Sequence, residues 1–527
     1  MATSQPVHGD SAGTFLGHPK GLFVLFFAEM WERFSYYGMR ALLIFYLTKH
    51  WLFSDSDAGV IYGAYTALVY ITPVVGGYLA DRYLGQRKAV LFGAVLLTLG
   101  HFFMAFEGDP GVGTENNPIV YVFWLALALI IVGSGFLKAN ISVIVGQLYP
   151  RTDTRRDAAY TIFYMGINLG AAIGSLLCGY IGETYGWAYG FGLAGIGMLA
   201  GLVVFIWGKP LLLGRGEPPK PLAKNTEWSM YGAGIAMVGI CWLAIQYQDL
   251  VGYVLGIFGG SLVLYVLFTA VVKLPSEERD RIFAAMFLIL TSIVFWALFE
   301  QAGSSLNLFT DRHVDRGGVP ASVFQSINAI YIILLAPVFA VVWQTLGRKG
   351  LEPSAPLKFG MGVVQVGLGF LVLVWGAQSV GMNAAVPVLF IFLIYLLHTT
   401  GELCLSPVGL SAMNRLAPAH MASLIMGTWF FASATGNFAA GLIASATGAE
   451  GVGEEAGKQV VLDVYSTVGW YAVAIGVGVM VISPLIKKLM HLDTLKDDSV
   501  GDDLLGQSEG PGEAQGAGVH PETRPAG

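Results

Sequence analysis

The sequence predicts an all-α polytopic membrane protein with fourteen transmembrane helices. Two features of its composition favour this fold class, because 55% of the 527 residues are hydrophobic and only 12% are charged. Soluble domains carry about 25% charged residues. A third feature is the recurrence of apolar stretches that can cross the roughly 30 Å hydrocarbon core of a bilayer. So much apolar surface cannot be buried in one or two soluble cores. The composition therefore excludes a soluble enzyme, a nucleic-acid-binding protein and a disordered scaffold.

The charges between the apolar stretches indicate how the chain is oriented. The expected membrane segments are 21–48, 58–80, 89–107, 119–148, 158–182, 188–208, 229–247, 251–273, 282–309, 322–346, 357–379, 385–413, 421–447 and 462–488. Three of the 29 Lys and Arg residues, Arg33, Arg40 and Lys138, lie well inside them, more than two residues from either end. With a cytoplasmic N-terminus, only Lys49, Arg312, Arg316 and Lys458 fall on the outer side, which leaves 22 on the cytoplasmic side. This bias follows the positive-inside rule, and it predicts a multi-pass protein of the cytoplasmic (inner) membrane with both termini cytoplasmic.

The segments group as six, two and six, which predicts two helix bundles and an additional pair. The expected parts are a disordered N-terminus at 1–17, an N-terminal six-helix bundle at 18–208, a cytoplasmic linker at 209–228, two extra transmembrane helices at 229–273, a C-terminal six-helix bundle at 274–490 and an acidic disordered tail at 491–527. The tail holds eight acidic and two basic residues, so it accounts for the formal net charge of −6. Few apolar residues and a high charge predict disorder there. The three cysteines lie in apolar stretches and are expected to be free thiols, with no metal and no cofactor.

Ionisable residues inside the predicted segments are the strongest indication of function. They are Glu29, Glu32, Arg33, Arg40, Lys138, Glu300 and Glu402. A single charge at the bilayer centre costs about 2.5–3.5 kcal/mol. These groups must therefore pair with one another or face water, which predicts a polar cavity between the bundles. Glu29, Arg33 and their neighbours recur at three- and four-residue spacing, so they form one polar stripe on the first helix. A charge network that only joins two helices is the structural alternative, although buried ion pairs seldom add stability over apolar packing.

Four motifs, in order along the chain, carry a resemblance to a known family. They are Glu29-x-x-Glu32-Arg33-Phe34-x-Tyr36-Tyr37-Gly38; Gly76-Gly77-x-Leu79-Ala80-Asp81-Arg82-x-x-Gly85-x-Arg87-Lys88; Phe163-Tyr164-Met165-Gly166-Ile167-Asn168-Leu169-Gly170 with Gly186-Trp187-x-x-Gly190-Phe191; and Gly401-Glu402-Leu403-x-x-Ser406-Pro407-Val408-Gly409-Leu410. The first, third and fourth resemble helix signatures of the proton-coupled oligopeptide transporters. The second is similar to a loop motif of the major facilitator superfamily. The resemblance implies a major facilitator-like fold of two six-helix bundles with the extra central helix pair of bacterial members.

The resemblance also implies a function and a set of site residues. It implies a proton-coupled symporter that imports di- and tripeptides by alternating access, works as a monomer and is not an enzyme. The implied substrate-binding residues are Arg33, Tyr36, Tyr37, Arg40, Tyr70, Lys138, Asn168, Trp296, Glu300, Asn328, Glu402, Ser406 and Trp429. Within this set, Arg33 and Lys138 would bind the peptide carboxylate. Glu402, with Asn168 and Asn328, would bind the amino terminus.

Proton coupling and gating are assigned to a second set of residues. Glu29, Glu32 and Arg33 would carry the proton coupling. Arg40 with Glu300 would form an outer gate pair, and Lys138 with Glu402 an inner one. Asp81, Arg82 and Arg87, with Lys88, are expected to form a gate hinge at the cytoplasmic edge.

Several alternatives stay open from the sequence. Aromatic residues such as Tyr36 or Trp429 can equally be ordinary packing or part of an interfacial aromatic belt. Asn168 and Asn328 can be interhelical hydrogen-bonding residues. His398, four residues before Glu402, is either a proton relay or a histidine satisfied by a neighbouring helix. Animal members carry a histidine in the second helix that the stretch Ile61-Tyr62-Gly63 lacks, and Ala171-Ala172 also departs from the family pattern. An anion or a modified amino acid is an alternative cargo, and a membrane sensor that does not transport is the alternative from another class.

Overall fold

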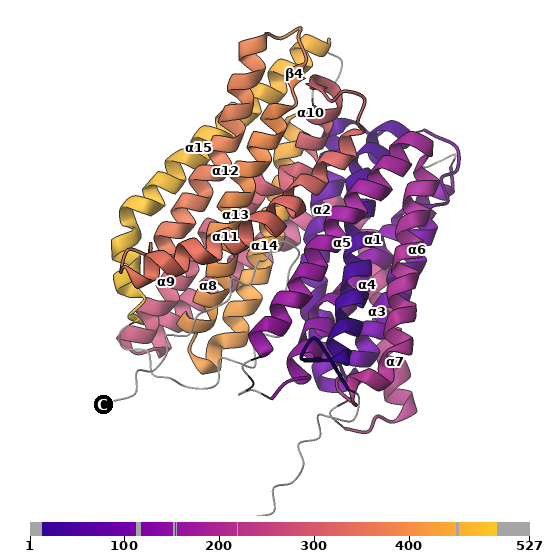
Figure 1. Ribbon diagram of the computed structural model, residues 1–527, viewed down its shortest axis with the longest axis vertical. Coiled ribbons are helices and arrows are strands. Elements are labelled where there is room, and N and C mark those ends of the chain that lie inside the picture. The colour runs from indigo at the N-terminus through magenta and orange to yellow at the C-terminus, as the bar shows by residue number, and fades with distance from the viewer. Residues whose placement is uncertain are drawn as a thin grey trace, which may run out of the picture.

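The structure is a computed structural model that describes residues 13–111, 117–150, 153, 155–218, 220–448 and 453–492. The helices in this part are α1 Lys20–Phe45, α2 Asp55–Leu79, α3 Gln86–Met104, α4 Ile119–Gln147, α5 Arg156–Tyr185, α6 Trp187–Trp207, α7 Lys224–Gln246, α8 Gln248–Lys273, α9 Ser276–Phe299, α10 Ser305–His313, α11 Ser326–Arg348, α12 Ala355–Val380, α13 Leu389–Leu416, α14 Ala422–Ala446 and α15 Glu454–Leu489. The short elements are β1 Thr14–Phe15, β2 His18–Pro19, β3 Val314–Asp315, β4 Val386–Pro387, η1 Tyr46–His50, η2 Ala80–Leu84, η3 Lys209–Leu212, η4 Glu300–Gly303, η5 Ala321–Gln325 and η6 Ala419–Met421. Helices thus dominate the described chain (Figure 1).

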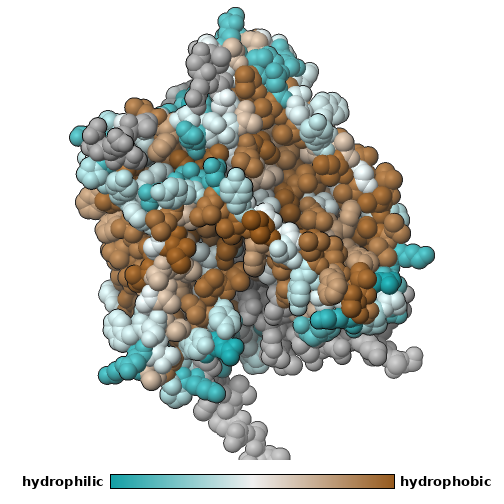
Figure 2. Space-filling view, turned by 180° about the vertical axis from the view of Figure 1, so that it is seen from behind, coloured by the Kyte–Doolittle hydropathy of each residue, from teal (hydrophilic) through white to brown (hydrophobic). Residues whose placement is uncertain are grey.

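The described helices correspond to the fourteen predicted membrane segments. Twelve are long and apolar enough to span a bilayer, with α9 and α10 forming one of these spans. The other two are α1, in which charged residues lower the hydropathy, and α14, which contains several Ser, Thr and Gly residues. Figure 2 shows hydrophobic side chains over much of the sides of the molecule, with hydrophilic ones gathered toward the two ends. This distribution is that of a protein surrounded by lipid.

Two hydrophobic clusters divide the membrane helices. One cluster draws most of its buried residues from α1–α8, and the other draws its residues from α8 onward. Figure 1 shows the two groups as separate bundles, the earlier helices in indigo and magenta and the later ones in orange and yellow. We call the end of the bundles at which α10 lies the α10 end. The opposite end, at which η3 and the residues that follow it lie, is called the linker end.

The two bundles meet at the α10 end through helices of unusually close approach. A Cβ atom placed on Gly63 of α2 would lie 2.6 Å from Cα of Gly441 of α14, so the two backbones touch there. One turn away, Gly59 lies against the backbone of Ser445, whose hydroxyl is hydrogen-bonded to Ser56 at 2.5 Å. Small residues allow such contact between membrane helices. The seam between α2 and α14 is therefore closed at the α10 end.

The first membrane segment of the C-terminal bundle is broken, although the sequence predicts an uninterrupted segment over 282–309. Helix α9 ends at Phe299, a 3-10 turn follows over η4, and α10 begins at Ser305. Ser304 has φ −123° and ψ −99°, outside the helical region. Gly303, in the 3-10 turn of this break, lies against Tyr62 of α2, because a Cβ atom there would collide with the tyrosine hydroxyl.

The N-terminal end also differs from the expectation of disorder over residues 1–17. Residues Thr14–Phe15 pair with His18–Pro19 in a short antiparallel hairpin. His18 Nδ1 lies 2.8 Å from the hydroxyl of Tyr149, and Arg155 donates a hydrogen bond to the Gly17 carbonyl at 2.8 Å. These contacts order residues 13–17, because they tie the hairpin to the turn between α4 and α5. The predicted disorder of residues 1–12 and of the acidic tail from residue 493 concerns residues outside the described ranges.

Candidate functional site

The polar stripe of α1 forms a compact ion cluster. Arg33 Nε lies 2.6 Å from Glu29 Oε1 and 3.0 Å from Glu32 Oε2, and all three side chains are at most 2% exposed. The helical spacing of one turn places these three groups on one face. Glu29 Oε2, both oxygens of Glu32 and Arg33 Nη1 have no hydrogen-bond partner among the described residues. The cluster is thus ion-paired but incompletely hydrogen-bonded, so it retains the capacity to bind a further group or a proton.

Lys138 of α4 faces this stripe and lies between aromatic rings. Its Nζ is 4.8 Å from the ring centroid of Tyr70 and 5.5 Å from that of Tyr36. The side chain is buried, at 3% exposure, and in the described part of the chain Nζ has no hydrogen-bond partner. Lys138 is also close enough to Arg33 and Glu32 to interact electrostatically with both. A buried ammonium held by ring faces can bind an anion.

Arg40, two turns further along α1, joins the two bundles. Its guanidinium forms an ion pair with Glu300 of η4, and its Nε donates a hydrogen bond to the hydroxyl of Tyr62 at 2.6 Å. The predicted contact between Arg40 and Glu300 is therefore present. Sequence reasoning missed the role of Tyr62 of α2. Tyr62 lies 22 residues after Arg40 on another helix, so the sequence does not indicate that the two are in contact.

Glu402 of α13 lies on the C-terminal bundle, within a small polar group. Asn328 of α11 donates one hydrogen bond to Glu402 Oε2 and another to Thr399 Oγ1, each at 3.0 Å. Glu402 is fully buried. Asn328 therefore orients the Glu402 carboxylate, and the predicted proximity of these two residues is present.

A small cavity connects the predicted asparagines at the bundle interface. It has a volume of about 30 Å³. Its lining residues are Tyr37, Ile167, Asn168, Ala171, Ser175, Gln325, Asn328, Ala329 and Ile332. This space holds about one water molecule. None of the charged residues of the predicted polar cavity lines this space, and it is too narrow for a peptide unless the bundles move apart.

The remaining predicted aromatic residues pack within the C-terminal bundle. Trp296 lies against Gly436, where a Cβ atom would be 2.8 Å from the tryptophan side chain, and its ring contacts Phe295 edge-on at a centroid distance of 5.2 Å. Trp429 is fully buried against Gly409 and Phe359. Ser406 is also fully buried. In this conformation Trp429 is packed inside the C-terminal bundle, which agrees with the packing alternative for this residue.

His398 faces away from the bundle interface. Its Nε2 lies 3.1 Å from the Val366 carbonyl of α12, and its ring contacts Phe370 at a centroid distance of 5.0 Å. A histidine held by a neighbouring helix is the alternative that this geometry favours over a relay to Glu402.

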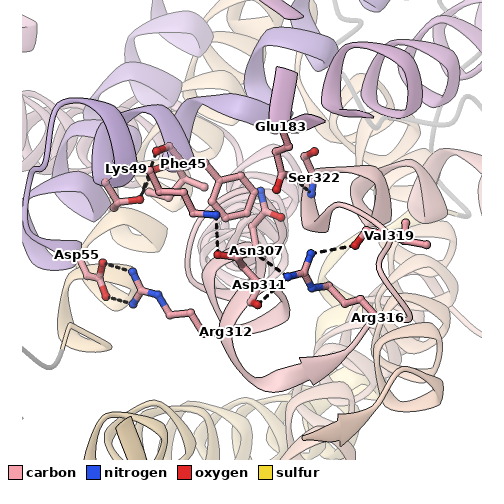
Figure 3. A network of polar contacts seen from close by, with 12 residues as sticks. Phe45, Lys49, Asp55, Glu183, Asn307, Asp311, Arg312, Arg316, Val319 and Ser322 are labelled. Carbon is pink, nitrogen blue, oxygen red and sulfur yellow. Dashed lines mark hydrogen bonds and ion pairs between the residues drawn. The ribbon is translucent and has the colours of Figure 1, made fainter. Parts of the chain in front are cut away.

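The α10 end is closed by a second set of polar contacts, which Figure 3 shows from close by. Lys49 of η1 lies 2.7 Å from Asp311 of α10, and Arg312 of α10 forms an ion pair with Asp55 of α2. Glu183 of α5 accepts a hydrogen bond from the backbone N–H of Ser322 at 2.7 Å. Sequence reasoning missed these pairs. A signal existed, because Lys49 and Arg312 are two of the few basic residues expected on the outer side.

The predicted gate hinge contacts the linker and α7. Arg87 donates hydrogen bonds to both carboxylate oxygens of Glu217, at 2.5 and 3.1 Å, and Lys88 lies 2.7 Å from Glu227 of α7. Asp81 accepts a hydrogen bond from Gln86 at 2.8 Å, and the Arg82 guanidinium lies 6.0 Å from the ring of Tyr78. The cluster thus joins η2 and α3 to the connection between the bundles.

The expected inner pair of Lys138 and Glu402 is not formed in this conformation. No hydrogen bond reaches Lys138 Nζ within the described ranges, whereas Glu402 is bonded to Asn328. The α10 end is closed by ion pairs while this inner contact is open. Lys138 on one bundle and Glu402 on the other thus carry opposite charges that are not paired with each other, which suits a ligand with both charges.

Comparisons with known proteins agree with this geometry. The PTR2 model, described as the POT family, matches residues 87–456. The peptide transporter YePEPT of Yersinia enterocolitica is 38% identical over 459 residues, covering 82% of this chain and 88% of its own. A di-/tripeptide transporter of Lactococcus lactis is 34% identical over 452 residues, covering 80% and 88%. A crystal structure of the peptide transporter POT, in a substituted form with sulfate, superposes with a TM-score of 0.79 at 35% identity, covering 91% and 97%. The chain therefore belongs to the POT family, the proton-coupled oligopeptide transporters within the major facilitator superfamily, and it is a membrane transporter and not an enzyme.

Proposed function

We propose that this protein is a symporter that imports di- and tripeptides with protons by alternating access. The observation that carries the proposal is the buried ammonium of Lys138, which has aromatic neighbours but no hydrogen-bond partner in the described structure. Its position beside Arg33 suits the carboxylate of a peptide. Relatives that are named peptide and di-/tripeptide transporters support the same substrate class.

The two ends of the peptide are held by opposite bundles in this proposal. Arg33 and Lys138 bind the carboxylate, and Glu402, oriented by Asn328, binds the amino terminus with Asn168 nearby. A zwitterion then bridges the bundles, and its binding energy draws them together. Side chains of variable sequence meet aromatic walls with few polar groups, which suits a promiscuous site.

The proton is carried by Glu29 or Glu32, and its binding is linked to that of the peptide. While both carboxylates are ionised, they hold Arg33 at 2.6 and 3.0 Å. Protonation of one carboxylate weakens this hold and frees the guanidinium for the substrate carboxylate. Glu29→Gln or Glu32→Gln should therefore keep peptide exchange but lose uphill uptake. If both variants still concentrate peptide against a gradient, the assignment fails.

The orientation follows from the basic residues. Most Lys and Arg residues lie at the linker end, so this end faces the cytoplasm and the α10 end faces outward. Both termini are then cytoplasmic in the inner membrane, and the single chain contains the complete site. One proton that moves down about 100 mV gains roughly 2.3 kcal/mol, and each tenfold accumulation costs about 1.4 kcal/mol. The membrane potential alone thus supports about fortyfold accumulation of a neutral peptide.

Uptake into proteoliposomes tests the proposal directly. The purified protein is reconstituted, and a labelled dipeptide is added with and without an acid-outside pH gradient. Accumulation above the outside concentration only with the gradient supports the symporter. Uptake of nitrate or of a free modified amino acid in place of dipeptide would identify another cargo. No uptake of any of them by folded protein would favour a membrane sensor.

A further inference from the structure

Helix α7 is fixed to the N-terminal bundle along its length. Near the linker end, Glu227 pairs with Lys88 of α3 at 2.7 Å. In the middle, Gly234 packs against the ring of Phe92. At the α10 end, Trp242 Nε1 donates a hydrogen bond to the Tyr121 carbonyl of α4 at 3.2 Å. These three attachments make α7 part of the N-terminal body (Figure 1).

Helix α8 passes from one hydrophobic cluster to the other. Val251 and Leu255, in its first half, belong to the cluster of the N-terminal bundle. Val266 and Ala270, in its second half, belong to the cluster of the C-terminal bundle. The buried residues of its first half and of its second half thus belong to different clusters. It also contacts α2, α9 and α14, so it covers the seam between the bundles.

The contacts of α8 with the C-terminal bundle are apolar. The ring of Phe438 of α14 lies 2.8 Å from a Cβ position at Gly252, and Phe431 occupies the corresponding space at Gly259. Phe258 packs on Phe431 at a centroid distance of 5.5 Å. Ring-into-glycine contacts carry no directional hydrogen bond, so the two surfaces can shift at small cost.

The part of α8 between its two buried halves contains glycines that packing does not require. Gly256 and Gly260 lie between Leu255 and Val266, and no heavy atom lies within 4 Å of a Cβ placed on either. Glycine is among the least favourable residues in a helix interior, and runs of Gly and Ser are common sites of helix bending. The sequence therefore places a flexible point where α8 leaves one body for the other.

We propose that α8 is a flexible strap that bends at Gly256–Gly260 as the two bundles rock. Its first half moves with α7 and the N-terminal bundle, and its second half moves with the C-terminal bundle. This inference rests on the alternating access of the proposed function. It gives the extra helix pair a mechanical role: the pair keeps the α2–α14 seam covered in both conformations.

Stiffening the strap tests the proposal, because the open space at both glycines accepts a methyl group. The double variant Gly256→Ala/Gly260→Ala should fold normally and lower the maximal rate of dipeptide uptake by about tenfold, which corresponds to about 1.4 kcal/mol. The concentration for half-maximal uptake should stay unchanged, since neither glycine is at the site. The matched control is Gly232→Ala/Gly239→Ala on α7, where the Cβ positions are equally open, and it should transport at the wild-type rate.

The outcomes separate this inference from the proposed function. Wild-type protein that takes up dipeptide establishes the function whatever the variants do. A wild-type rate in the α8 double variant overturns the strap, as does an equal loss in the α7 control. A second readout uses spin labels at Ile240 of α7 and Leu264 of α8, both well exposed. Their separation should change when dipeptide and acid pH are added, whereas the separation from Ile240 to Val95 of α3 should not. A constant Ile240–Leu264 separation would contradict the proposal.

Discussion

Arg40 of α1 and Glu300 of η4 form a buried ion pair between the two bundles, at 7% and 3% exposure. Tyr62 of α2 accepts a second hydrogen bond from the same guanidinium, at 2.6 Å. Gly303 packs directly against the Tyr62 hydroxyl, so the break between α9 and α10 and the ion pair form one unit. This unit lies on the α10 side of the Glu29–Arg33 cluster, and its opening must accompany any access from that end.

Charge reversal tests whether this pair is a direct gate contact. Removing one partner of a buried ion pair costs about 3–5 kcal/mol, so Glu300→Arg should lower uptake more than about a hundredfold. The double variant Arg40→Glu/Glu300→Arg should regain a measurable part of the rate in the same proteoliposome assay. The control exchanges the charges of Lys49 and Asp311, a pair in which the lysine is exposed. Loss of this pair should cost at most about 1 kcal/mol. A folded double variant as inactive as the single one would argue against a direct gate contact.

Lys138 gives a prediction about the substrate carboxylate. Loss of a hydrogen bond to a charged group costs about 1.5–3 kcal/mol, so Lys138→Gln should raise the half-saturating dipeptide concentration by about tenfold or more. A dipeptide with an amidated C-terminus serves as the matched substrate. Wild-type protein should bind the amide more weakly than the acid. In Lys138→Gln this preference for the acid should be smaller, because only Arg33 then holds the carboxylate. If the variant still prefers the acid to the wild-type extent, Lys138 does not bind the carboxylate.

The sequence predicts the charged stripe and the bundles well, because charges in apolar segments must have partners. Glu29, Arg33 and Lys138 stand out for this reason, and the structure places them together. The charge pattern placed Arg312 on the outer side, but its partner Asp55 could not be predicted, since 257 residues separate the two. The position of Tyr62 beside Arg40 is hidden in the same way.

The break after Phe299 is also absent from the sequence pattern. Hydropathy continues through the segment, and a glycine such as Gly303 is tolerated within many helices. The collision that forbids a side chain there comes from Tyr62, on another helix. Likewise, the residues of the hairpin at Thr14–Phe15 are few and weakly patterned, and their order depends on Tyr149 and Arg155.

The glycine contact between α2 and α14 predicts how the α10 end closes. Gly63→Leu should force the helices apart, because its Cβ alone would overlap Gly441. Overpacking costs about 1–3 kcal/mol. The conformation in which the α10 end is open should therefore become roughly ten- to a hundredfold more populated. A cysteine at Ser445 should then react faster with a membrane-impermeant maleimide, and uptake should fall. Gly427→Leu on α14 is the control, since nothing lies within 4 Å of its Cβ position. Equal labelling of both variants would mean that this contact does not close the α10 end.

The linker end gives a prediction about pH. A hydrogen bond from Arg87 lowers the pKa of Glu217 below its ordinary value of 4.5. A carboxylate whose pKa is depressed by folding stabilises the protein above its unfolded pKa, and this stabilisation is lost as pH falls through the folded value. Thermal unfolding in detergent should therefore show wild-type protein more stable than Glu217→Gln at about pH 7, by at most about 1 kcal/mol because the pair is partly exposed. The difference should shrink below about pH 4.3. Glu278→Gln removes a carboxylate at the same end with no ion pair in the described ranges, and it should show no such trend. A Glu217→Gln deficit that persists unchanged at low pH would show that the stabilisation does not come from the ionised carboxylate.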